Sequence, residues 1–497
     1  MIKWVHTPLV AILLVGGCTV GPTYAPLQSE LPSSYPPSPS IDTSSQSLTT
    51  WWTQFHDPLL DRLVARGLAD NLDIQTAGTR VKEARIQEAI ERGAGAPQVS
   101  ASAQASYTKL SANSLGSALS GLLGGGSSGS SSGIGLPGSD FPTYQMGFDA
   151  SWELDLFGGQ RRANEAVAAK TESAIWSSRD AQVTLTAEIA NTYLQYRLIQ
   201  QRLSVVDQSI ETDNDLLDIA NVRISNGLTN TLDQQKQVSE QAQLKATRAD
   251  LQAQAETHLH MLAYLLGPLS DSLIEEVRAS SGPSPVIATV PAGLPSDLLS
   301  RRPDIRAADR QWAAATADIG VAKADLYPKL SLTGALQLVS QDLSTLLDSD
   351  SVQSNAGAKL SLPLLNGGAR RGTVSLREAQ AEEAGLTYRQ KVFGAFRDVR
   401  DGLSRLDADR DKLDQLRVAE AAARESTDTL STRYHAGLIS LPEVLQAQKT
   451  WLNAQDATAQ AEAAAAQDMV SLYKALGGGW DATTTNTIEG PVRGKAN

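Results

Sequence analysis

The chain has 497 residues, a formal net charge of −12 and a single cysteine, with 41% hydrophobic and only 5% aromatic residues. The acidic balance leaves no basic stripe to neutralise phosphates, which argues against nucleic-acid binding, and one cysteine excludes an intrachain disulfide. A chain rich in Ala and Leu but poor in aromatic residues is typical of long helices packed side by side.

The N-terminus has the order of a secretory signal, with a short basic start and an apolar run over 9–15 that is too short to span a bilayer. The following Val15-Gly16-Gly17-Cys18 resembles the lipobox of bacterial lipoproteins, so we expect a covalent lipid on Cys18. The alternative is a plain secretory signal with an incidental cysteine. Because Thr19 follows, the lipobox resemblance implies sorting to the outer membrane. One lipid chain anchors only marginally, so a second membrane contact is expected.

Residues 19–50 are rich in Pro, Ser and Thr and are expected to form an extended tether. Asp57 followed by Pro58 predicts a helix start, with Asp57 as the capping residue. Helical spacing of apolar residues then predicts one helix from Leu59 to Arg92.

After this helix the period of the pattern changes to two. Alternating polar and apolar residues predict strands near 98–109 and 142–155. The Gly/Ser-rich stretch 111–138 between them is expected to be a loop. Matches in this loop to a serine-hydrolase elbow and a dinucleotide fingerprint follow from its composition, because neither follows a strand and opens a helix.

Long helical patterns run from Gln160 to Asn226 and from Thr231 to Leu266. A helix of the first length extends roughly 100 Å at ~1.5 Å per residue. The Pro-containing stretch 268–295 is interpreted as a crossing linker. The helix Thr231–Leu266 and the short helix of the next half (297–326) add up to about one long helix, so we expect these two to stack along it.

The second half repeats the first. The loop Arg223–Asp233 recurs 210 residues later at Arg433–Glu443, with an Arg, a Gly-Leu pair and an acid in register, which indicates a duplication. Each copy lies between two helical patterns, as the tip of a helical hairpin does. The Gly-Gly-x-Arg-Arg motif at 158–162 recurs at 367–371, and strands are predicted near 329–339 and 355–364.

Four strands cannot close a barrel, and an open sheet edge cannot lie in lipid. Their lengths and alternating faces fit transmembrane strands. Two copies would give eight strands and a filled interior, whereas three would give twelve strands with a water-filled lumen. The alternative is a soluble β-sandwich that caps a coiled coil.

The doubled tips, the Gly-Gly-x-Arg-Arg motifs, Arg301 to Ile305 and the Gly-Pro-x-Tyr at 21–24 together resemble TolC-like outer-membrane efflux factors of the lipoprotein (NodT/OprM) branch. The resemblance implies a mainly α homotrimer with a twelve-stranded transmembrane β-barrel on a twelve-helix coiled-coil tunnel. It implies a lipid-anchored, outer-membrane-spanning exit duct of a tripartite efflux system of RND or related type. Such a duct passively conducts drugs or other small molecules, with a periplasmic adaptor (membrane fusion protein) and an inner-membrane transporter as partners.

The resemblance also implies site residues. Gly227, Leu228, Gly437 and Leu438 match the tips on which adaptor hairpins dock, although Gly could be needed only for the turn. Asp233 and Tyr434 match residues that narrow the periplasmic end of the tunnel. Relatives carry an Arg and an inward Asp where this chain has Ile439 and Gln446. We therefore expect an aperture closed by a hydrogen bond between Tyr434 and Asp233 rather than by ion pairs.

No catalytic constellation is found, and neither an enzyme nor a cofactor other than the Cys18 lipid is expected. His258 and His260 are two residues apart and cannot share a helix face. Two alternatives remain open: a structural coiled-coil lipoprotein of the outer membrane without transport, and a periplasmic hydrolase, for which no nucleophile and base converge.

The expected organisation follows the chain in six parts: signal peptide 1–17; lipidated tether 18–57; first repeat 58–267 with its tip at 225–231; linker 268–296; second repeat 297–477 with its tip at 435–441; and C-terminal tail 478–497.

Overall fold

The computed structural model describes residues 19–26, 32, 41–42, 48–109, 140–227, 231–268, 270–280, 290–291, 297 and 301–480. The chain divides into two compact units, each assembled from separate stretches of sequence. The sheet unit comprises Met1–Ala25, Arg85–Ala169 and Ala313–Glu382, and the hairpin unit comprises Pro26–Ala84, Lys170–Trp312 and Glu383–Asn497. Among the described helices, none combines the length and the apolar character needed to cross a membrane.

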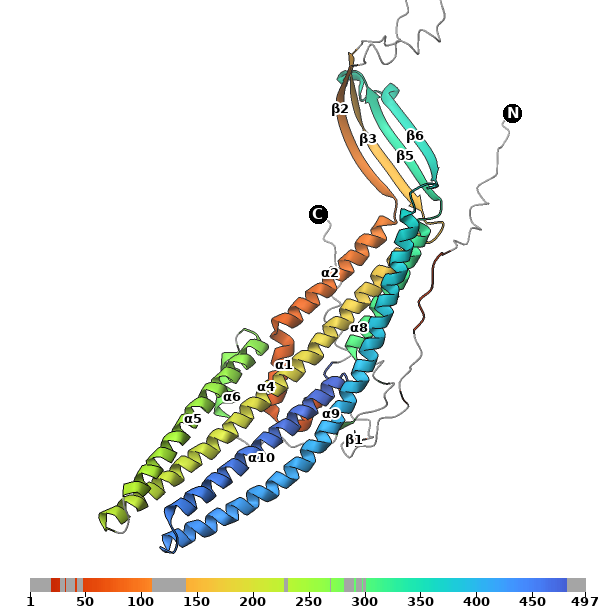
Figure 1. Cartoon of the computed structure of the whole chain (residues 1–497). Helices are drawn as coiled ribbons and strands as arrows, with labels where there is room; N and C mark the ends of the chain where they lie inside the picture. The colour runs from red at the N-terminus through yellow and green to blue at the C-terminus, as the bar shows by residue number, and fades with distance from the viewer. Residues whose placement is uncertain are drawn as a thin grey trace, which may run out of the picture. The chain divides into compact units, whose positions relative to one another are not determined.

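The sheet unit contains one antiparallel four-stranded sheet with the strand order β2-β3-β5-β6 (Figure 1). Its strands are β2 (Gln98–Lys109), β3 (Asp140–Leu154), β5 (Lys329–Ser340) and β6 (Val352–Ser361). The last strand therefore lies three residues before the 355–364 predicted from alternation. Pro363 has no N–H to donate to a strand ladder, which explains why the strand ends before it. The outer strands β2 and β6 have no partner on their second edge within the described chain.

The two faces of this sheet differ in chemistry, as the alternating sequence predicts. On one face Gln145 Nε2 donates to Gln337 Oε1 at 2.7 Å, and Gln337 Nε2 donates to Asp149 Oδ1 at 2.9 Å. On the other face Phe148 and Leu336 pair across β3 and β5 and remain more than half exposed. A face of large apolar side chains that no described part of the chain covers needs an apolar environment.

Two helical hairpins form most of the hairpin unit (Figure 1). Hairpin 1 consists of α4 (Gly159–Ser225) and α5 (Thr231–Leu266), and hairpin 2 of α9 (Ala369–His435) and α10 (Leu441–Ala475). The first turns of α4 and α9 belong to the sheet unit. The bounds of hairpin 1 confirm the predicted helical patterns to within one residue.

The prediction of a single helix from Leu59 to Arg92 is wrong. The chain forms two helices, α1 (Pro58–Asp70) and α2 (Leu72–Ala94), with a break at Asn71. Asn71 has an extended backbone, and its Oδ1 accepts from the N–H groups two and three residues later at 2.8 and 3.1 Å. This is the geometry of an N-terminal cap, so Asn71 starts a new helix. The apolar spacing continues across Asn71, which is why the sequence pattern predicts one helix.

The linker expected at 268–295 is also more ordered than its proline content indicated. It contains the helix α6 (Asp271–Ala279), which buries Ile274. It also contains the short strand β4 (Val290–Pro291), which pairs in parallel with β1 (Ile41–Asp42). Prolines mark the ends of such short elements as readily as they mark an unstructured crossing.

The predicted stacking of the helix Thr231–Leu266 with the short helix of the next half is wrong, because each helix meets a partner in its own repeat. The end of α5 meets the start of α2 in its own repeat, where Asn71 Nδ2 donates to the Leu265 carbonyl at 2.9 Å. In the second repeat the end of α10 meets the start of α8 (Pro303–Ala324), where Arg302 Nη1 donates to the Ala475 carbonyl at 3.0 Å. Helix ends expose unpaired carbonyls, and each junction supplies a side-chain donor to one of them.

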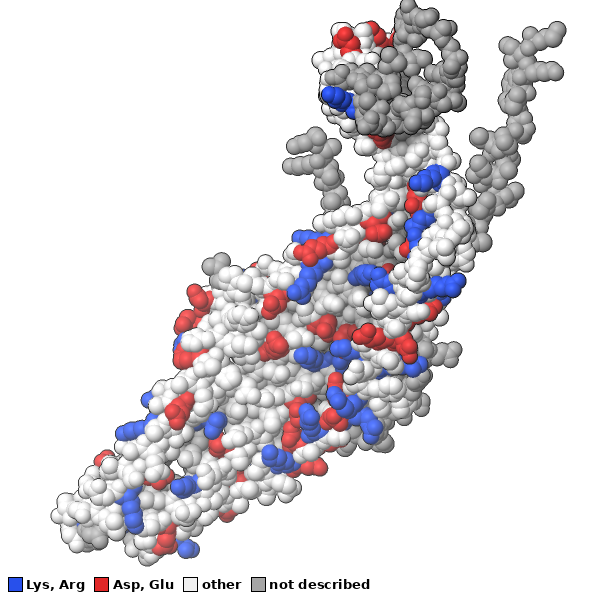
Figure 2. Space-filling model, turned by 45° about the horizontal axis from the view of Figure 1, so that its top comes forward, with Lys and Arg blue, Asp and Glu red and all other residues white. Residues whose placement is uncertain are grey.

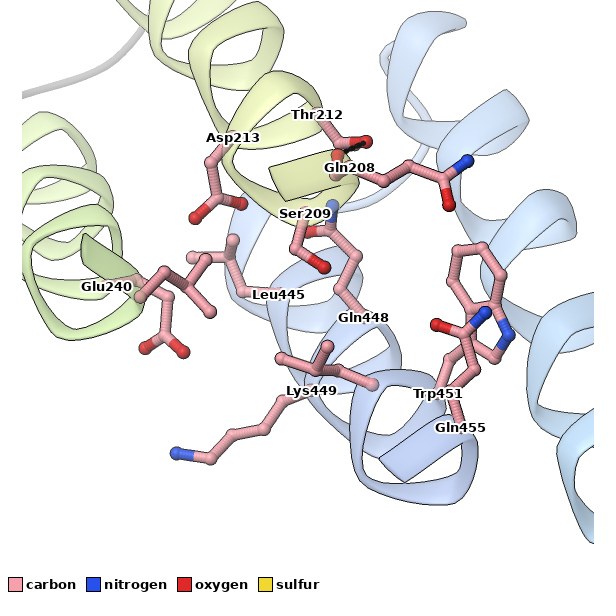
Figure 3. A pocket seen from close by; sticks show the side chains of 12 residues that line it. Gln208, Ser209, Thr212, Asp213, Glu240, Leu445, Gln448, Lys449, Trp451 and Gln455 are labelled. Atoms are coloured by element: carbon pink, nitrogen blue, oxygen red, sulfur yellow. Dashed lines mark hydrogen bonds between the residues drawn. The ribbon is translucent and has the colours of Figure 1, made fainter. Parts of the chain in front are cut away.

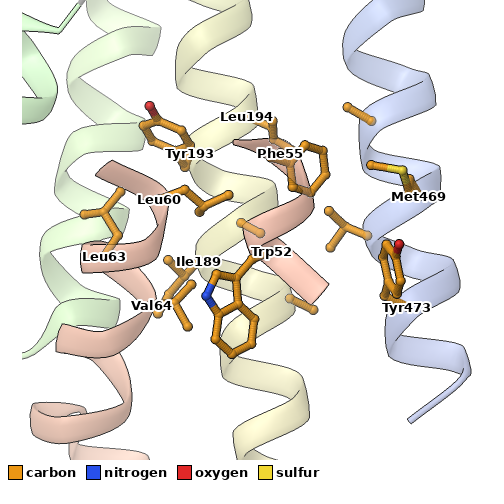
Figure 4. Close-up of a cluster of buried hydrophobic side chains, with 14 of the residues drawn as sticks. Trp52, Phe55, Leu60, Leu63, Val64, Ile189, Tyr193, Leu194, Met469 and Tyr473 are labelled. Carbon is orange, nitrogen blue, oxygen red and sulfur yellow. The ribbon is translucent and has the colours of Figure 1, made fainter. Parts of the chain in front are cut away.

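The main apolar core of the hairpin unit forms where a 3-10 helix (Trp51–Phe55) and α1 pack against α4 and α10 (Figure 4). The Trp51 and Tyr473 rings stack with centroids 5.2 Å apart. Asp57 caps α1 as predicted: its Oδ1 accepts from the second residue of the helix at 2.9 Å. Its Oδ2 accepts from the Tyr193 hydroxyl at 2.6 Å, so the cap also ties α1 to α4.

Charged residues of both signs are interspersed over the visible face of the helices (Figure 2). Some pair between helices: Arg202 Nε contacts Asp456 Oδ1 at 2.5 Å and so links α4 to α10, and Arg248 contacts Asp207 within hairpin 1 at 2.6 Å. The second pair is half exposed, and pairs of that kind contribute at most about 1 kcal/mol.

Candidate functional site

The tip of hairpin 2 is a compact helix-terminating turn. Gly437 has a φ of +76°, and its N–H donates to the Tyr434 carbonyl at 2.9 Å. The N–H of Leu438 donates to the Arg433 carbonyl at 3.0 Å. These two bonds define a Schellman motif, which needs a left-handed residue at the glycine position.

The next helix begins two residues later with its own cap. The N–H of Ser440 donates to Glu443 Oε1 at 3.3 Å, its hydroxyl donates to the same oxygen at 2.9 Å, and Pro442 occupies the first turn. Both sides of the loop are thus held by local hydrogen bonds. Between them Leu438 is 74% exposed, so a large apolar side chain stands on a well-defined turn.

The described part of the tip of hairpin 1 has the same glycine conformation and the same first hydrogen bond. Gly227 has a φ of +69°, and its N–H donates to the Ile224 carbonyl at 3.0 Å. Leu228, predicted as a docking residue, lies outside the described residues. Asp233 lies in the first turn of α5, but its side chain is likewise outside the description, so its predicted bond to Tyr434 stays a prediction.

Tyr434 is a core residue of the tip region. It is 2% exposed and packs with Leu216 of α4 and with Leu441 and Val444 of α10. Arg223, from the last turn of α4, stacks its guanidinium 4.1 Å from the Tyr434 ring centroid and donates through Nη2 to the Tyr434 carbonyl at 2.7 Å. A cation over an aromatic face adds to apolar packing, so Tyr434 joins hairpin 1 to hairpin 2.

A polar pocket lies between α4, α5 and α10, farther along the hairpins from the tips (Figure 3). Three side-chain atoms of its lining are buried without a hydrogen-bond partner in the described chain: Asp213 Oδ2, Gln448 Oε1 and Trp451 Nε1. Its full lining is Gln208, Ser209, Thr212, Asp213, Glu240, Leu244, Leu445, Gln448, Lys449, Trp451, Leu452 and Gln455. Buried polar atoms without partners are costly, and a bound water molecule can satisfy them.

Asp213 is the buried acid of this pocket, at 3% exposure. Burial raises the pKa of the Asp213 carboxyl to about 6, and the carboxylate of Glu240 on α5 adds to the rise. Gln237 of α5 is fully buried beside Asp213, and its Nε2 donates to the Asp213 backbone carbonyl at 3.1 Å. We call these two residues the polar layer. The interface of the two hairpins therefore contains a carboxyl whose pKa lies well above its ordinary value.

Sequence reasoning did not identify Arg223, Asp213 or Trp451 as site residues. The register of Arg223 with Arg433 in the duplicated loop was the available signal for the first. Asp213 is one acid among several on α4, and only tertiary packing distinguishes it from its neighbours. Within the described part of the chain, no group of three or more His, Cys, Asp or Glu side chains is arranged to hold a metal ion.

The comparisons with known proteins agree with this architecture. The model of the family described as "Outer membrane efflux protein" matches residues 63–268 and 294–478. The pyoverdine export outer membrane protein OpmQ of Pseudomonas aeruginosa is 33% identical over 95% of this chain and 96% of its own length. The nodulation protein T of Rhizobium leguminosarum bv. viciae is 29% identical over 95% of this chain and 92% of its own.

Solved structures share the fold as well. The structure of the outer-membrane channel OprN has a TM-score of 0.83 and 31% identity, and covers 93% of this chain and 100% of its own. The CmeC outer membrane channel of Campylobacter jejuni, at 23% identity, has the same fold with a TM-score of 0.83 over 95% of this chain and 98% of its own.

The chain belongs to the outer membrane efflux protein family. It is therefore an outer-membrane channel of an efflux pump, a passive conduit with a periplasmic tunnel, and not an enzyme. Members of the family are channels without a cofactor and work with pump partners. The similarity confirms the predicted fold class, a mainly α trimeric channel with a transmembrane β-barrel on a helical tunnel.

Proposed function

We propose that three copies of this chain close a barrel by pairing β2 of one copy with β6 of the next. The open outer edges of the four-stranded sheet carry this proposal. In lipid each unpaired backbone group costs several kcal/mol, so the edges need partners. Pairing in sequence around three copies leaves none, and it turns the apolar face with Phe148 and Leu336 to lipid and the face with Gln145 and Asp149 to the lumen.

The N-terminus provides the second membrane contact in this proposal, through a lipid on Cys18. The lipobox-like Val15-Gly16-Gly17-Cys18 supports it, as does the absence of any other cysteine in the sequence. Two membrane signals give stable anchoring where one acyl chain does not.

The tips Gly227-Leu228 and Gly437-Leu438 are the proposed docking points for a periplasmic adaptor, which connects the channel to an inner-membrane transporter of RND or related type. The exposure of Leu438 on a turn fixed by local hydrogen bonds supports this role. An exposed apolar anchor on a rigid turn loses little entropy when a partner covers it.

Beside the tips, a hydrogen bond between Tyr434 and Asp233 is proposed to narrow the periplasmic aperture. Tyr434 is held in place by its packing against Arg223 and Leu216, so its hydroxyl has a defined position near the tips.

The exported compounds are small molecules whose choice lies outside the channel. Relatives of similar identity carry names that refer to unlike cargo, such as pyoverdine in one case and toluene in another. Because conduits of one architecture are associated with such different molecules, we expect the choice of cargo to be made at the pump and not at the duct.

Planar-bilayer recording of the purified trimer tests the duct and its aperture together. Wild-type trimers are expected to show a small single-channel conductance. The double variant Tyr434→Phe with Asp233→Ala is expected to show a larger one. The Phe ring keeps the packing against Arg223, so only the hydroxyl is removed. If the double variant conducts no better than wild type, the proposed aperture is wrong; if wild-type trimers do not conduct at all, the duct itself is contradicted.

A further inference from the structure

The described segment directly after Cys18, residues 19–25, is docked on the sheet unit, so the extended tether expected for residues 19–50 is held at its start. The N–H of Val20 donates to the Phe157 carbonyl at 3.1 Å. Arg162, in the first turn of α4, donates through Nε to the Val20 carbonyl at 3.3 Å and through Nη2 to the Gly21 carbonyl at 3.5 Å. The same Nη2 reaches the Thr23 hydroxyl at 3.4 Å.

Arg162 is built into this position. Its side chain is only 6% exposed, and its charge is balanced by Glu165 at 2.7 Å. A buried guanidinium needs partners for its donors, and here two backbone carbonyls and a hydroxyl of the N-terminal segment supply them. Removal of the segment would leave those donors unsatisfied, so the segment and Arg162 stabilise each other.

Glycines make room for the docked segment. A Cβ on Gly21, whose φ is +97°, would lie 2.5 Å from Gly320 Cα in α8. A Cβ on Gly320 would lie 2.7 Å from Arg162 Cγ, and a Cβ on Gly158 would lie 2.9 Å from Thr19 Cα. At Gly21 and Gly158 the close neighbour is backbone, and at Gly320 it is the stem of the Arg162 side chain, so a side chain at any of the three would displace the segment or Arg162.

The segment continues with Tyr24, which packs on an alanine cluster of Ala169, Ala313 and Ala314. Small residues on α4 and α8 thus give an aromatic ring a surface on which it packs. Polar contacts at Arg162 and apolar contacts at Tyr24 act on the same seven-residue stretch (19–25), which we call the strap.

The second repeat has the same motif without a strap. Arg371 occupies the place of Arg162 in the repeated Gly-Gly-x-Arg-Arg. Its side chain is exposed and makes no hydrogen bond or ion pair in the described part of the chain. Gly367 takes the place of Gly158, and a Cβ there would meet no described atom within 4 Å. The motif alone therefore does not require these contacts, and the strap accounts for the burial of Arg162.

The strap begins beside an aromatic pair. Phe157, whose carbonyl accepts from Val20, stacks on Tyr327 with ring centroids 4.6 Å apart. Both aromatics lie where strands of the sheet join helices, Phe157 after β3 and Tyr327 before β5. Aromatic side chains are enriched at the level where a membrane meets water.

We propose that Arg162 is the latch of a strap, residues 19–25, which fixes the point at which the N-terminal lipid anchor leaves the protein, beside the turn between β3 and α4. The role of the strap in anchoring rests on the proposed lipidation of Cys18, whereas the docking of the strap does not depend on it. A latched strap holds the acyl chains next to the strands, whereas a loose one would join them to the channel by a flexible chain.

Limited proteolysis of purified full-length trimers tests this proposal. Chymotrypsin cleaves after Tyr24 only when the strap is released, and mass spectrometry identifies the new N-terminus at Ala25. Arg162→Ala is expected to raise the rate of this cleavage at least about tenfold, since loss of one buried charged hydrogen-bonding group corresponds to ~1.4 kcal/mol or more. The matched control Arg371→Ala is expected to cleave at the wild-type rate.

Equal cleavage rates in Arg162→Ala and wild type would overturn the latch. If Arg162→Ala does not form trimers, Gly21→Ala takes its place, because the added Cβ collides with Gly320 and displaces the strap without touching the Arg162 side chain. The released N-terminal peptide separates the two hypotheses: a peptide without acyl mass contradicts lipidation of Cys18, while the cleavage rates still decide whether the strap is latched.

Discussion

The two repeats of this channel agree where helices end and differ where hairpins pack. At the helix junctions, Asn71 and Arg302 donate to Leu265 and Ala475, carbonyls 210 residues apart in the sequence. Each bond satisfies a helix-terminal carbonyl, a requirement that the backbone imposes on any sequence. Side chains of different chemistry can meet this requirement, so the duplication has preserved the contact but not the residue.

Between the hairpins the side chains have diverged. Hairpin 1 has the buried layer of Asp213 and Gln237, whereas the positions 210 residues later in hairpin 2 are Ala423 and Ala447. At the tips, the position of the buried Tyr434 is taken in hairpin 1 by the half-buried Ile224. A duplicated scaffold can thus give one hairpin a polar layer and the other an aromatic link to its neighbour.

The largest expected effect is at the aromatic link. Tyr434→Ala removes a fully buried ring and is expected to destabilise the tip by about 4 kcal/mol, because large-to-small changes of a buried aromatic leave a cavity. The corresponding Ile224→Ala is expected to cost about 1 kcal/mol, because Ile224 is only half buried. Hydrogen exchange of the tip amides measures both. Equal losses of protection would mean that the two tips are packed alike.

The helix junctions give the next largest effect. Burial is the largest influence on the pKa of Asp304 and opposes its ionisation. The hydrogen bond and charge of Arg302, together with the charge of Lys391 and the N–H of Ile305, outweigh burial and hold that pKa below its usual value. Arg302→Ala leaves that carboxylate without its main partner and is expected to cost about 3 kcal/mol. Asn71→Ala leaves one carbonyl and a helix start unpaired and is expected to cost about 2 kcal/mol. Thermal unfolding of the trimers checks the order, which a larger loss for Asn71→Ala would contradict.

The polar layer predicts a dependence on pH. The pKa of the Asp213 carboxyl is raised to about 6 in the folded protein, whereas its ordinary value is 3.8. Between these two pH values the carboxyl keeps its proton in the folded protein but has released it in the unfolded chain. Stability contributed by the protonated form is thus lost as pH rises from about 4 to about 6. Asp213→Asn is expected to melt a few degrees above wild type at about pH 7.5 and to match it at about pH 4.

The control for this prediction lies on the same helix. Asp215 is exposed, so Asp215→Asn is expected to leave the melting temperature unchanged at both pH values. An unchanged difference between wild type and Asp213→Asn across this pH interval would show that Asp213 is ionised throughout, with a partner in its pocket.

Much of this fold follows from local sequence, and the exceptions share a cause. The strands, the long helices, the cap at Asp57 and the doubled tips follow from periodicity, capping and glycine position. The pairing of α5 with α2 depends on the contact from Asn71 to Leu265, nearly 200 residues away, which no local pattern contains. The break at Asn71 uses a local cap, but a continuous apolar spacing across it hides that cap in the sequence. The burial of Arg162, Asp213 and Tyr434 has the same origin, since identical residue types elsewhere in the chain are exposed.

The smallest expected effect is one that the two tips should share. Gly227→Ala and Gly437→Ala add a Cβ that meets no described atom within 4 Å, so their cost is the left-handed backbone alone, about 1 kcal/mol each. Gly78 in α2 has equally open surroundings and no positive φ, so Gly78→Ala is expected to stabilise the protein by up to about 1 kcal/mol. Hydrogen exchange at the two tips and in α2 separates these cases. Unequal losses at the two tips would mean that the chain approaches one of the glycines more closely than the other, so that hairpins alike in backbone would differ there too.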